Sequence, residues 1–185
     1  MRIIAGSHKG RKLLSCKGLE LRPTSGRVRE ALFSILERHI VGSLFLDLYA
    51  GTGAVGLEAL SRGAQRVVFV ESHPDSLCLL HANLQRCHFP LQVDIQACSV
   101  AEFFRRSVTP SAVFDIVFAD PPYEEDSTNL LPLLGQNAMI GNDTIVLLEH
   151  PTKHSIPSQV GNLGRVRYYR YGDTSLSKFA LMRSH

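Results

Sequence analysis

The sequence predicts an α/β fold in which a doubly wound, mostly parallel sheet is covered by helices on both faces. From residue 44 onward, apolar runs of strand length alternate with segments of helical periodicity, a pattern typical of successive parallel strand–helix units. Near the end, two expected strands are separated by Gly172-Asp173-Thr174 and predict an antiparallel terminal hairpin. With 185 residues and 44% hydrophobic composition, the chain is long enough for one well-packed domain.

Residues 1–22 read as short extended segments with turns at Gly6, Gly10 and Gly18, and predict a small β-hairpin extension. Apolar residues at helical spacing follow over residues 28–36, after Thr24 and Ser25, either of which can cap a helix. We therefore divide the chain into an N-terminal extension, residues 1–22, and a main domain, residues 23–185.

Seven strands and four further helices are expected after residue 40. The strands are residues 44–48, 66–70, 91–97, 113–119, 144–149, 165–171 and 177–182. The helices are residues 55–62, 74–86, 100–106 and 130–138, the second starting with proline in its first turn.

Positive charge is concentrated at the N-terminal end of the chain. The net charge is +3, but residues 1–40 carry nine Lys and Arg against three Glu, which makes +6 in that part alone. A basic end on a mildly acidic body suggests a docking site for a polyanion, although a solvated charged face has the same composition.

The sequence gives no support for a membrane protein, a secreted protein or a metal-binding protein. No stretch approaches the ~20 apolar residues of a membrane helix, and the residues after Met1 lack the pattern of a secretory signal. The four cysteines form no CxxC pair, which favours reduced thiols in a cytoplasmic protein. The histidines are scattered, so we expect no metal site.

The most informative stretch is Asp120-Pro121-Pro122-Tyr123, directly after the apolar run at residues 113–119. Two prolines cannot donate backbone hydrogen bonds, so the strand must end there with its carbonyls facing a cleft. A carboxylate, a rigid carbonyl and an aromatic ring together suit the exocyclic amine of a flat base: the oxygens accept the amine's protons while the ring stacks. A plain turn with a capping Asp is the simpler interpretation.

A glycine-rich turn forms the second motif. Gly51, Gly53 and Gly56 satisfy G-x-G-x-x-G between an expected strand and helix, and Glu71 ends the next strand 20 residues after Gly51. Taken alone, this fingerprint also fits a nicotinamide enzyme. Asp47, however, would face a pyrophosphate unfavourably, whereas it could pair with an amino acid's ammonium group. A ligand with a ribose, an adenine and an α-amino acid fits better, which predicts S-adenosylmethionine.

The predicted contacts follow from this choice. Asp47 would bind the ammonium group and Glu71 the ribose diol, while Gly51 and Gly53 allow close approach of the backbone. Ser99 and Val100, after the third strand, would lie near the adenine. The full predicted cofactor set is Asp47, Tyr49, Gly51, Thr52, Gly53, Glu71, Ser72, Ser99 and Val100.

With both motifs placed, the chain resembles the bacterial 16S ribosomal RNA (guanine-N2)-methyltransferase D family of class I S-adenosylmethionine-dependent methyltransferases. The matching segments are Arg2-Ile3-Ile4-Ala5-Gly6, Gly10-Arg11-Lys12-Leu13, Arg22-Pro23-Thr24, Arg27-Val28-Arg29-Glu30-Ala31-Leu32-Phe33, Asp47-Leu48-Tyr49-Ala50-Gly51-Thr52-Gly53, Asp120-Pro121-Pro122-Tyr123 and Tyr171-Gly172-Asp173-Thr174. The glycine and Asp-Pro-Pro-Tyr motifs indicate an amino-methyltransferase, and the Arg22–Phe33 block makes the resemblance specific.

The resemblance implies a seven-stranded Rossmann-like methyltransferase domain at residues 23–185 and an RNA-binding extension at residues 1–22. It implies transfer of the cofactor's methyl group to a guanine N2 amine of 16S rRNA, family position 966, within a small-subunit particle. Catalytic residues would be Asp120, Pro121, Pro122 and Tyr123. RNA would be held by His8, Lys9, Arg11, Lys12, Arg22, Arg27 and Arg29, although Arg22 or Arg29 could instead pair with Glu30. The protein is expected to be a cytoplasmic monomer.

Other functions stay open at this stage. An adenine-N6 or other base-amine methyltransferase acting on DNA or another RNA would use the same Asp-Pro-Pro-Tyr chemistry. A non-enzymatic RNA-binding assembly factor on the same scaffold is a different class, and a nicotinamide oxidoreductase ranks last.

Overall fold

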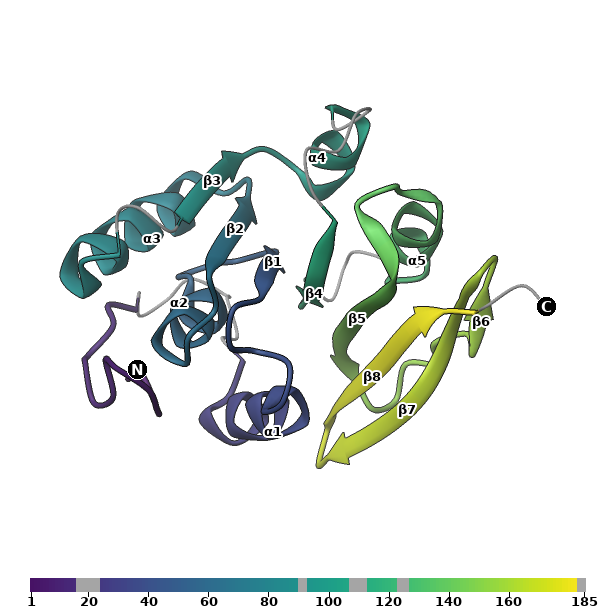
Figure 1. Ribbon diagram of the computed structural model, residues 1–185, viewed down its shortest axis with the longest axis horizontal. Coiled ribbons are helices and arrows are strands. Elements are labelled where there is room, and N and C mark those ends of the chain that lie inside the picture. The colour runs from purple at the N-terminus through teal and green to yellow at the C-terminus, as the bar shows by residue number, and fades with distance from the viewer. Residues whose placement is uncertain (16–23, 90–92, 107–112, 123–126, 183–185) are drawn as a thin grey trace.

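The computed structural model describes residues 1–15, 24–89, 93–106, 113–122 and 127–182, which fold as one mixed α/β unit (Figure 1). Its helices are α1 (Gly26–Leu36), α2 (Ala54–Ser61), α3 (Pro74–Cys87), α4 (Val100–Arg106) and α5 (Ser127–Gln136). Its strands are β1 (Leu44–Leu48), β2 (Arg66–Glu71), β3 (Val93–Ala97), β4 (Phe114–Ala119), β5 (Ile140–Pro151), β6 (Gln159–Val160), β7 (Leu163–Tyr171) and β8 (Thr174–Leu181).

The strands form one sheet in the order β3-β2-β1-β4-β5-β8-β7-β6. Neighbours from β3 to β5 are parallel, whereas β5–β8, β8–β7 and β7–β6 are antiparallel. The predicted mostly parallel sheet with an antiparallel terminal hairpin is therefore confirmed. The described residues contain eight strands rather than the expected seven, because the two-residue β6 is too short to show any periodicity in the sequence.

Alternate residues of the parallel strands pack on opposite faces of the sheet, and each face has its own hydrophobic core. Phe45 of β1 and Phe69 of β2 pack with α1, α2 and α3, while Leu46 and Val68 belong to the core with α4 and α5. Figure 1 shows the same division, with α4 and α5 together on one side of the sheet. Near-continuous apolar strands are what a sheet covered on both faces requires.

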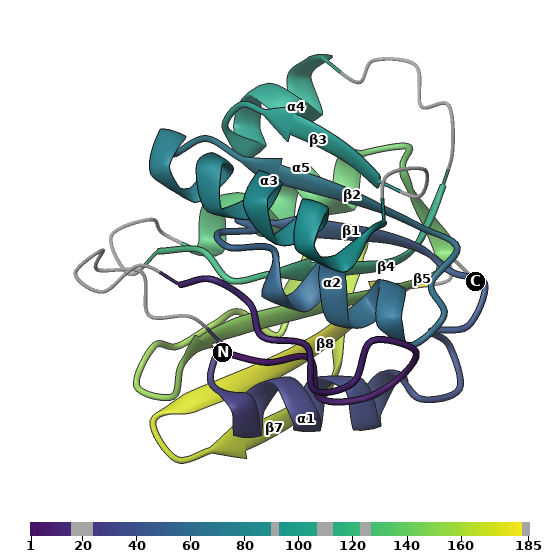
Figure 2. The same cartoon turned by 90° about the vertical axis from the view of Figure 1, so that its left-hand side faces the viewer.

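Residues 1–14 form an arm that lies across α2 (Figure 2). The arm turns back on itself through one antiparallel bridge, Arg2 to Lys12, and through backbone bonds such as Ile3 N–H to the Arg11 carbonyl, 3.0 Å. This is the turn predicted for the N-terminal extension, with a single bridge in place of a strand ladder. Residues 16–22 of that extension lie outside the described residues.

Among the described residues, no helix is long and apolar enough to cross a membrane. Three cysteines, Cys78, Cys87 and Cys98, are free thiols, and Cys16 lies outside the described residues.

Candidate active site

A cavity of about 420 Å³ opens at the carboxyl ends of the parallel strands, where the strand order reverses between β1 and β4. This reversal is the place where open α/β sheets bind their ligands, and the volume lies within the usual range for a small-molecule site. The register pairs Leu48 of β1 with Ala119 of β4, so the loops after these two strands begin side by side. Both sequence motifs therefore meet in one cavity.

The glycine turn lies between β1 and α2. Gly51 and Gly53 have positive φ angles of 55° and 76°, which glycine adopts at no steric cost. Gly56 serves packing: a Cβ added there would lie 2.3 Å from Cε1 of Phe69. The three glycines thus form the turn and allow α2 to approach the sheet closely.

Asp47 is fixed beneath this turn. Its side chain is 2% exposed, and its Oδ2 accepts a 2.8 Å hydrogen bond from the Gly56 N–H at the start of α2. Burial raises the pKa of Asp47 from 3.8 to about 8; the Gly56 hydrogen bond opposes this shift, and the nearby Glu71 charge adds to it. A cationic group bound beside Asp47 would stabilise its charged form and so lower this raised pKa.

Glu71, at the end of β2, is bonded to two loops at once. Its Oε2 accepts from Gly51 N–H at 2.7 Å, and its Oε1 accepts from Ser72 and His73 N–H at 2.8 and 2.7 Å. Charge-assisted bonds of this kind are stronger than neutral ones. Glu71 therefore joins the glycine turn to the β2–α3 loop, in addition to lining the cavity.

The other residues predicted to hold the cofactor are placed as follows. Tyr49, Gly51, Thr52, Ser72, Ser99 and Val100 line the cavity, together with Asp47 and Glu71. Gly53 does not line it, but is the N-cap residue of α2. The Ser99 Oγ accepts from Glu102 N–H at 3.2 Å, which ties this residue to the first turn of α4.

Three of the four residues predicted to act on a base amine are described, and they line the same cavity as the glycine turn. Asp120, Pro121 and Pro122 follow β4 and line the same cavity. Thr24, just before α1, donates from Oγ1 to Asp120 Oδ2 over 3.3 Å. Tyr123 lies outside the described residues.

The predicted RNA contacts that the structure describes do not line the cavity, and they differ in exposure. Lys9, Arg11 and Lys12 on the arm and Arg27 on α1 are exposed. His8 is half-buried against the Phe89 ring, with centroids 4.1 Å apart, and burial lowers the pKa of its imidazole. Arg22 lies outside the described residues.

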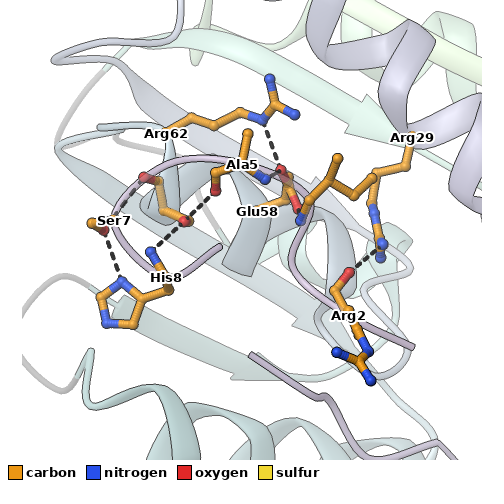
Figure 3. Close-up of polar contacts among 9 residues, drawn as sticks. Arg2, Ala5, Ser7, His8, Arg29, Glu58 and Arg62 are labelled. Carbon is orange, nitrogen blue, oxygen red and sulfur yellow. Dashed lines mark hydrogen bonds and ion pairs between the residues drawn. The ribbon is translucent and has the colours of Figure 1, made fainter. Parts of the chain in front are cut away.

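Arg29 differs from the expectation of a phosphate contact. It is 3% exposed and donates from Nη2 to the Arg2 carbonyl at 2.6 Å, so its guanidinium holds the arm to α1 (Figure 3). The sequence also allowed a pair between Arg29 and Glu30, but the hydrogen bond of Arg29 goes to the Arg2 carbonyl instead. The helical spacing of α1 explains the correction, because Arg29 shares a face with the buried Val28, Leu32 and Phe33.

Sequence reasoning missed several residues of the cavity wall. Thr24, Ser25, His73, Glu149, His150, Pro151 and Thr174 also line it. Glu149 and His150 follow Leu148, which pairs with Ala119, so the end of β5 lies beside Asp120. The rule that parallel strands place their carboxyl ends at one edge could have identified this position.

Burial favours the neutral form of the His150 imidazole. Burial lowers its pKa, Nδ1 lies 3.0 Å from the Pro151 carbonyl and Nε2 lies 2.9 Å from Ser177 Oγ. Because a carbonyl can only accept, Nδ1 donates and Nε2 accepts from the serine. The histidine thus fixes the end of β5 to β8.

Within the described ranges, no group of three or more His, Cys, Asp or Glu side chains is arranged to hold a metal ion.

Comparisons with known proteins show which proteins this chain resembles. Residues 1–180 match the family described as "Conserved hypothetical protein 95". The chain is 34% identical over 166 residues to "Ribosomal RNA small subunit methyltransferase D" of Escherichia coli K12, covering 88% of this chain and 80% of that protein. It is 32% identical over 178 residues to the YlbH protein of Bacillus subtilis, covering 96% and 97%.

A solved structure, the yhhF protein of Escherichia coli, superposes with a TM-score of 0.86 at 28% identity. The superposition covers 100% of this chain and 99% of that chain. The two chains therefore share the fold over their full aligned length.

Proposed function

This chain belongs to the Conserved hypothetical protein 95 family, with the Ribosomal RNA small subunit methyltransferase D proteins among its relatives, and we propose that it is an S-adenosylmethionine-dependent rRNA methyltransferase. The observation that carries the proposal is the single cavity lined by both the glycine turn and Asp120-Pro121-Pro122. A methyl donor and a base amine must meet within bonding distance, and this cavity offers a wall for each.

The residues around the glycine turn fit the cofactor. Asp47 would bind its ammonium group, because a buried carboxyl with a raised pKa gains most from a cationic partner. Glu71 would accept from a ribose hydroxyl through Oε2, which accepts one backbone bond and keeps a second lone pair, whereas Oε1 already accepts two. When bound, S-adenosylmethionine supplies an electrophilic methyl group.

The finer proposal is that the acceptor is the N2 amine of a guanine in 16S rRNA. Asp120 and the Pro121 carbonyl would each accept a hydrogen bond from one amine N–H and orient the nitrogen lone pair toward the methyl group. The methylated amine would then lose one proton to the Asp120 carboxylate, and S-adenosylhomocysteine would be the leaving group. Such orientation can supply several kcal/mol of the barrier, up to about 7–11 in the best intramolecular cases. The guanine must leave its stack to enter the cavity, where Tyr123 would stack on it.

Exposed cations outside the cavity would hold the RNA. Lys9, Arg11, Lys12 and Arg27 are proposed to contact phosphates, which gives affinity and position rather than base specificity. Binding should then weaken steeply as salt rises. The proposed substrate is rRNA in a small-subunit particle, and the proposed working form is a cytoplasmic monomer.

The decisive experiment is mass mapping of methylated bases in 16S rRNA after incubation with the purified chain and S-adenosylmethionine. One new methyl group on a guanine, at N2, is expected. Methyl transfer to adenine or to DNA would replace the guanine proposal with an adenine-N6 activity. RNA binding without any transfer would indicate an assembly factor instead.

A further inference from the structure

Asn83 on α3 is a fully buried amide that uses its oxygen and both hydrogens. Its Oδ1 accepts from Leu14 N–H at 2.7 Å, and its Nδ2 donates to the Leu14 carbonyl at 3.1 Å and to the Thr52 carbonyl at 3.0 Å. Leu14 is the last residue of the arm, and Thr52 lies in the glycine turn and lines the cavity. One rigid amide plane therefore joins the basic arm to the proposed cofactor loop.

The other arm contacts attach it to helices rather than to the loop. Glu58 of α2 accepts from Ile4 and Ala5 N–H at 2.7 and 2.9 Å, and also pairs with Arg62 at 2.8 Å (Figure 3). Ser61 accepts from His8 N–H at 2.9 Å and donates to the Ala5 carbonyl at 2.6 Å. Loss of the Asn83 amide hydrogens would thus leave the first eight residues of the arm attached.

The two donated bonds of Asn83 come from one planar NH₂ group, so their directions are linked. When the Thr52 carbonyl is fixed by a ligand in the cavity, the amide plane is fixed with it, and so is the end of the arm at Leu14. Arg11 and Lys12, both exposed, precede Leu14 by two or three residues. Ordering one site in this way lowers the entropic cost of ordering the other.

We propose that Asn83 is a positioning residue that couples the RNA-binding arm to the cofactor loop, so that cofactor and RNA each bind more tightly when the other is present. This inference rests on the proposed function for the identity of the two ligands. By linkage, the two affinities must change by the same factor, typically at least about fivefold when sites are coupled.

The test measures the Kd of S-adenosylhomocysteine with and without a saturating 16S rRNA fragment, at one fixed salt concentration, for three forms of the full chain. The wild-type ratio of the two Kd values is expected to be at least about fivefold. Asn83→Asp keeps the acceptor for Leu14 N–H but, even when protonated, can donate to only one of the two carbonyls, so the ratio should fall to about one. The same change at Asn137, whose Oδ1 accepts from Met139 N–H far from the cavity, should leave the ratio unchanged.

A second variant tests whether the effect of Asn83→Asp comes from the new acid group. A second readout tests the coupling without RNA. Asn83→Leu has similar volume and adds no charge, and it should abolish the coupling as well. Amide hydrogen exchange at Leu14 should slow when S-adenosylhomocysteine binds the wild type, with no slowing in Asn83→Asp. A wild-type ratio of one, or coupling retained in both Asn83 variants, would overturn the inference.

Failure of the proposed function would look different. In that case the wild type would bind neither S-adenosylhomocysteine nor RNA, or would bind both without transferring a methyl group. Bound cofactor that leaves Leu14 exchange unchanged counts against the coupling alone.

Discussion

The two sides of the cavity are built in different ways. On the glycine side, Glu71 accepts from backbone N–H groups of the loops after β1 and β2, and Asp47 accepts from Gly56 N–H at the start of α2, all within 20 residues in sequence. On the acceptor side, Asp120 accepts a hydrogen bond from Thr24, 96 residues away. That side is completed by the end of β5 and by Thr174 at the start of β8. One wall is local in sequence and the other is assembled from distant segments.

This difference separates two kinds of residue. The acids of the glycine side hold loops in shape, so their loss should affect both stability and ligand binding. Asp120 follows β4 at the cavity wall, so its loss should act mainly on the transfer of the methyl group. Variants on the two sides should therefore differ in whether they lose activity, stability or both.

Asp120→Ala should reduce methyl transfer by at least about 100-fold, because the amine loses the carboxylate that accepts its proton. The affinity for S-adenosylhomocysteine, measured by calorimetry, should stay within about twofold if the glycine side binds independently. Asp143→Ala, an exposed acid away from the cavity, is the matched control. Turnover close to wild type in Asp120→Ala would remove Asp120 from the mechanism.

Glu71→Gln should lower the free energy of unfolding by about 1–3 kcal/mol, because an amide group then faces backbone N–H donors and leaves one unpaired. Cofactor affinity should fall as well, since Gly51 loses or weakens its anchor. Urea unfolding measures the stability change. Glu102→Gln breaks only exposed ion pairs to Arg105 and Arg106 and should cost less than about 1 kcal/mol.

Asp47 should make the stability of the free protein depend on pH. Its folded pKa is about 8 against an ordinary value of 3.8, so between these values the folded protein holds a proton that the unfolded chain has released. The stabilisation is complete below about pH 4 and is lost as the pH rises to about 8. The slope is at most about 1.4 kcal/mol per pH unit.

Asp47→Asn should remove this contribution, because the amide oxygen can still accept from Gly56 N–H but does not titrate in this range. Denaturant unfolding of both proteins at several pH values gives the difference. Parallel stability curves for wild type and Asp47→Asn between pH 5 and 8 would contradict a protonated Asp47.

Ser99→Ala should have the smallest effect. The Ser99 hydroxyl accepts from Glu102 N–H at the start of α4, and loss of such a cap typically costs about 1 kcal/mol of stability. A large fall in cofactor affinity in this variant would instead assign the hydroxyl to the ligand, as the sequence first suggested.

The order and type of the central elements could be predicted from the sequence, because buried parallel strands and amphipathic helices carry distinct periodicities. The strand Leu44–Leu48 was predicted to the residue, and α3 to within one residue of its end. Boundaries failed where the pattern is weak: β5 begins at Ile140 rather than 144, since Gly141, Asn142 and Asp143 favour turns over strands.

The glycine side of the candidate site was also predictable, whereas the hydrogen bonds that hold the arm to α2 and α3 were not. Glycines and acids at strand ends form recognisable local patterns, because each strand end and its following loop are contiguous in sequence. Glu58 and Asn83 gave no such signal: each lies within a helix, and its partners on the arm are 53 to 69 residues away. Arg29 was predicted to contact RNA because its charge can be read from the sequence, whereas its burial depends on how α1 and the arm pack together.

Periodicity and neighbours along the chain were enough to predict the α/β class, the two motifs and the main residues of the glycine side. The packing of distant segments brings Thr24, Glu149, His150 and Thr174 to the same cavity as Asp120, and it lets Asn83 and Glu58 hold the basic arm. Burial and long-range hydrogen bonds arise only when distant segments pack together. The type of a residue therefore does not specify which partner its side chain will contact.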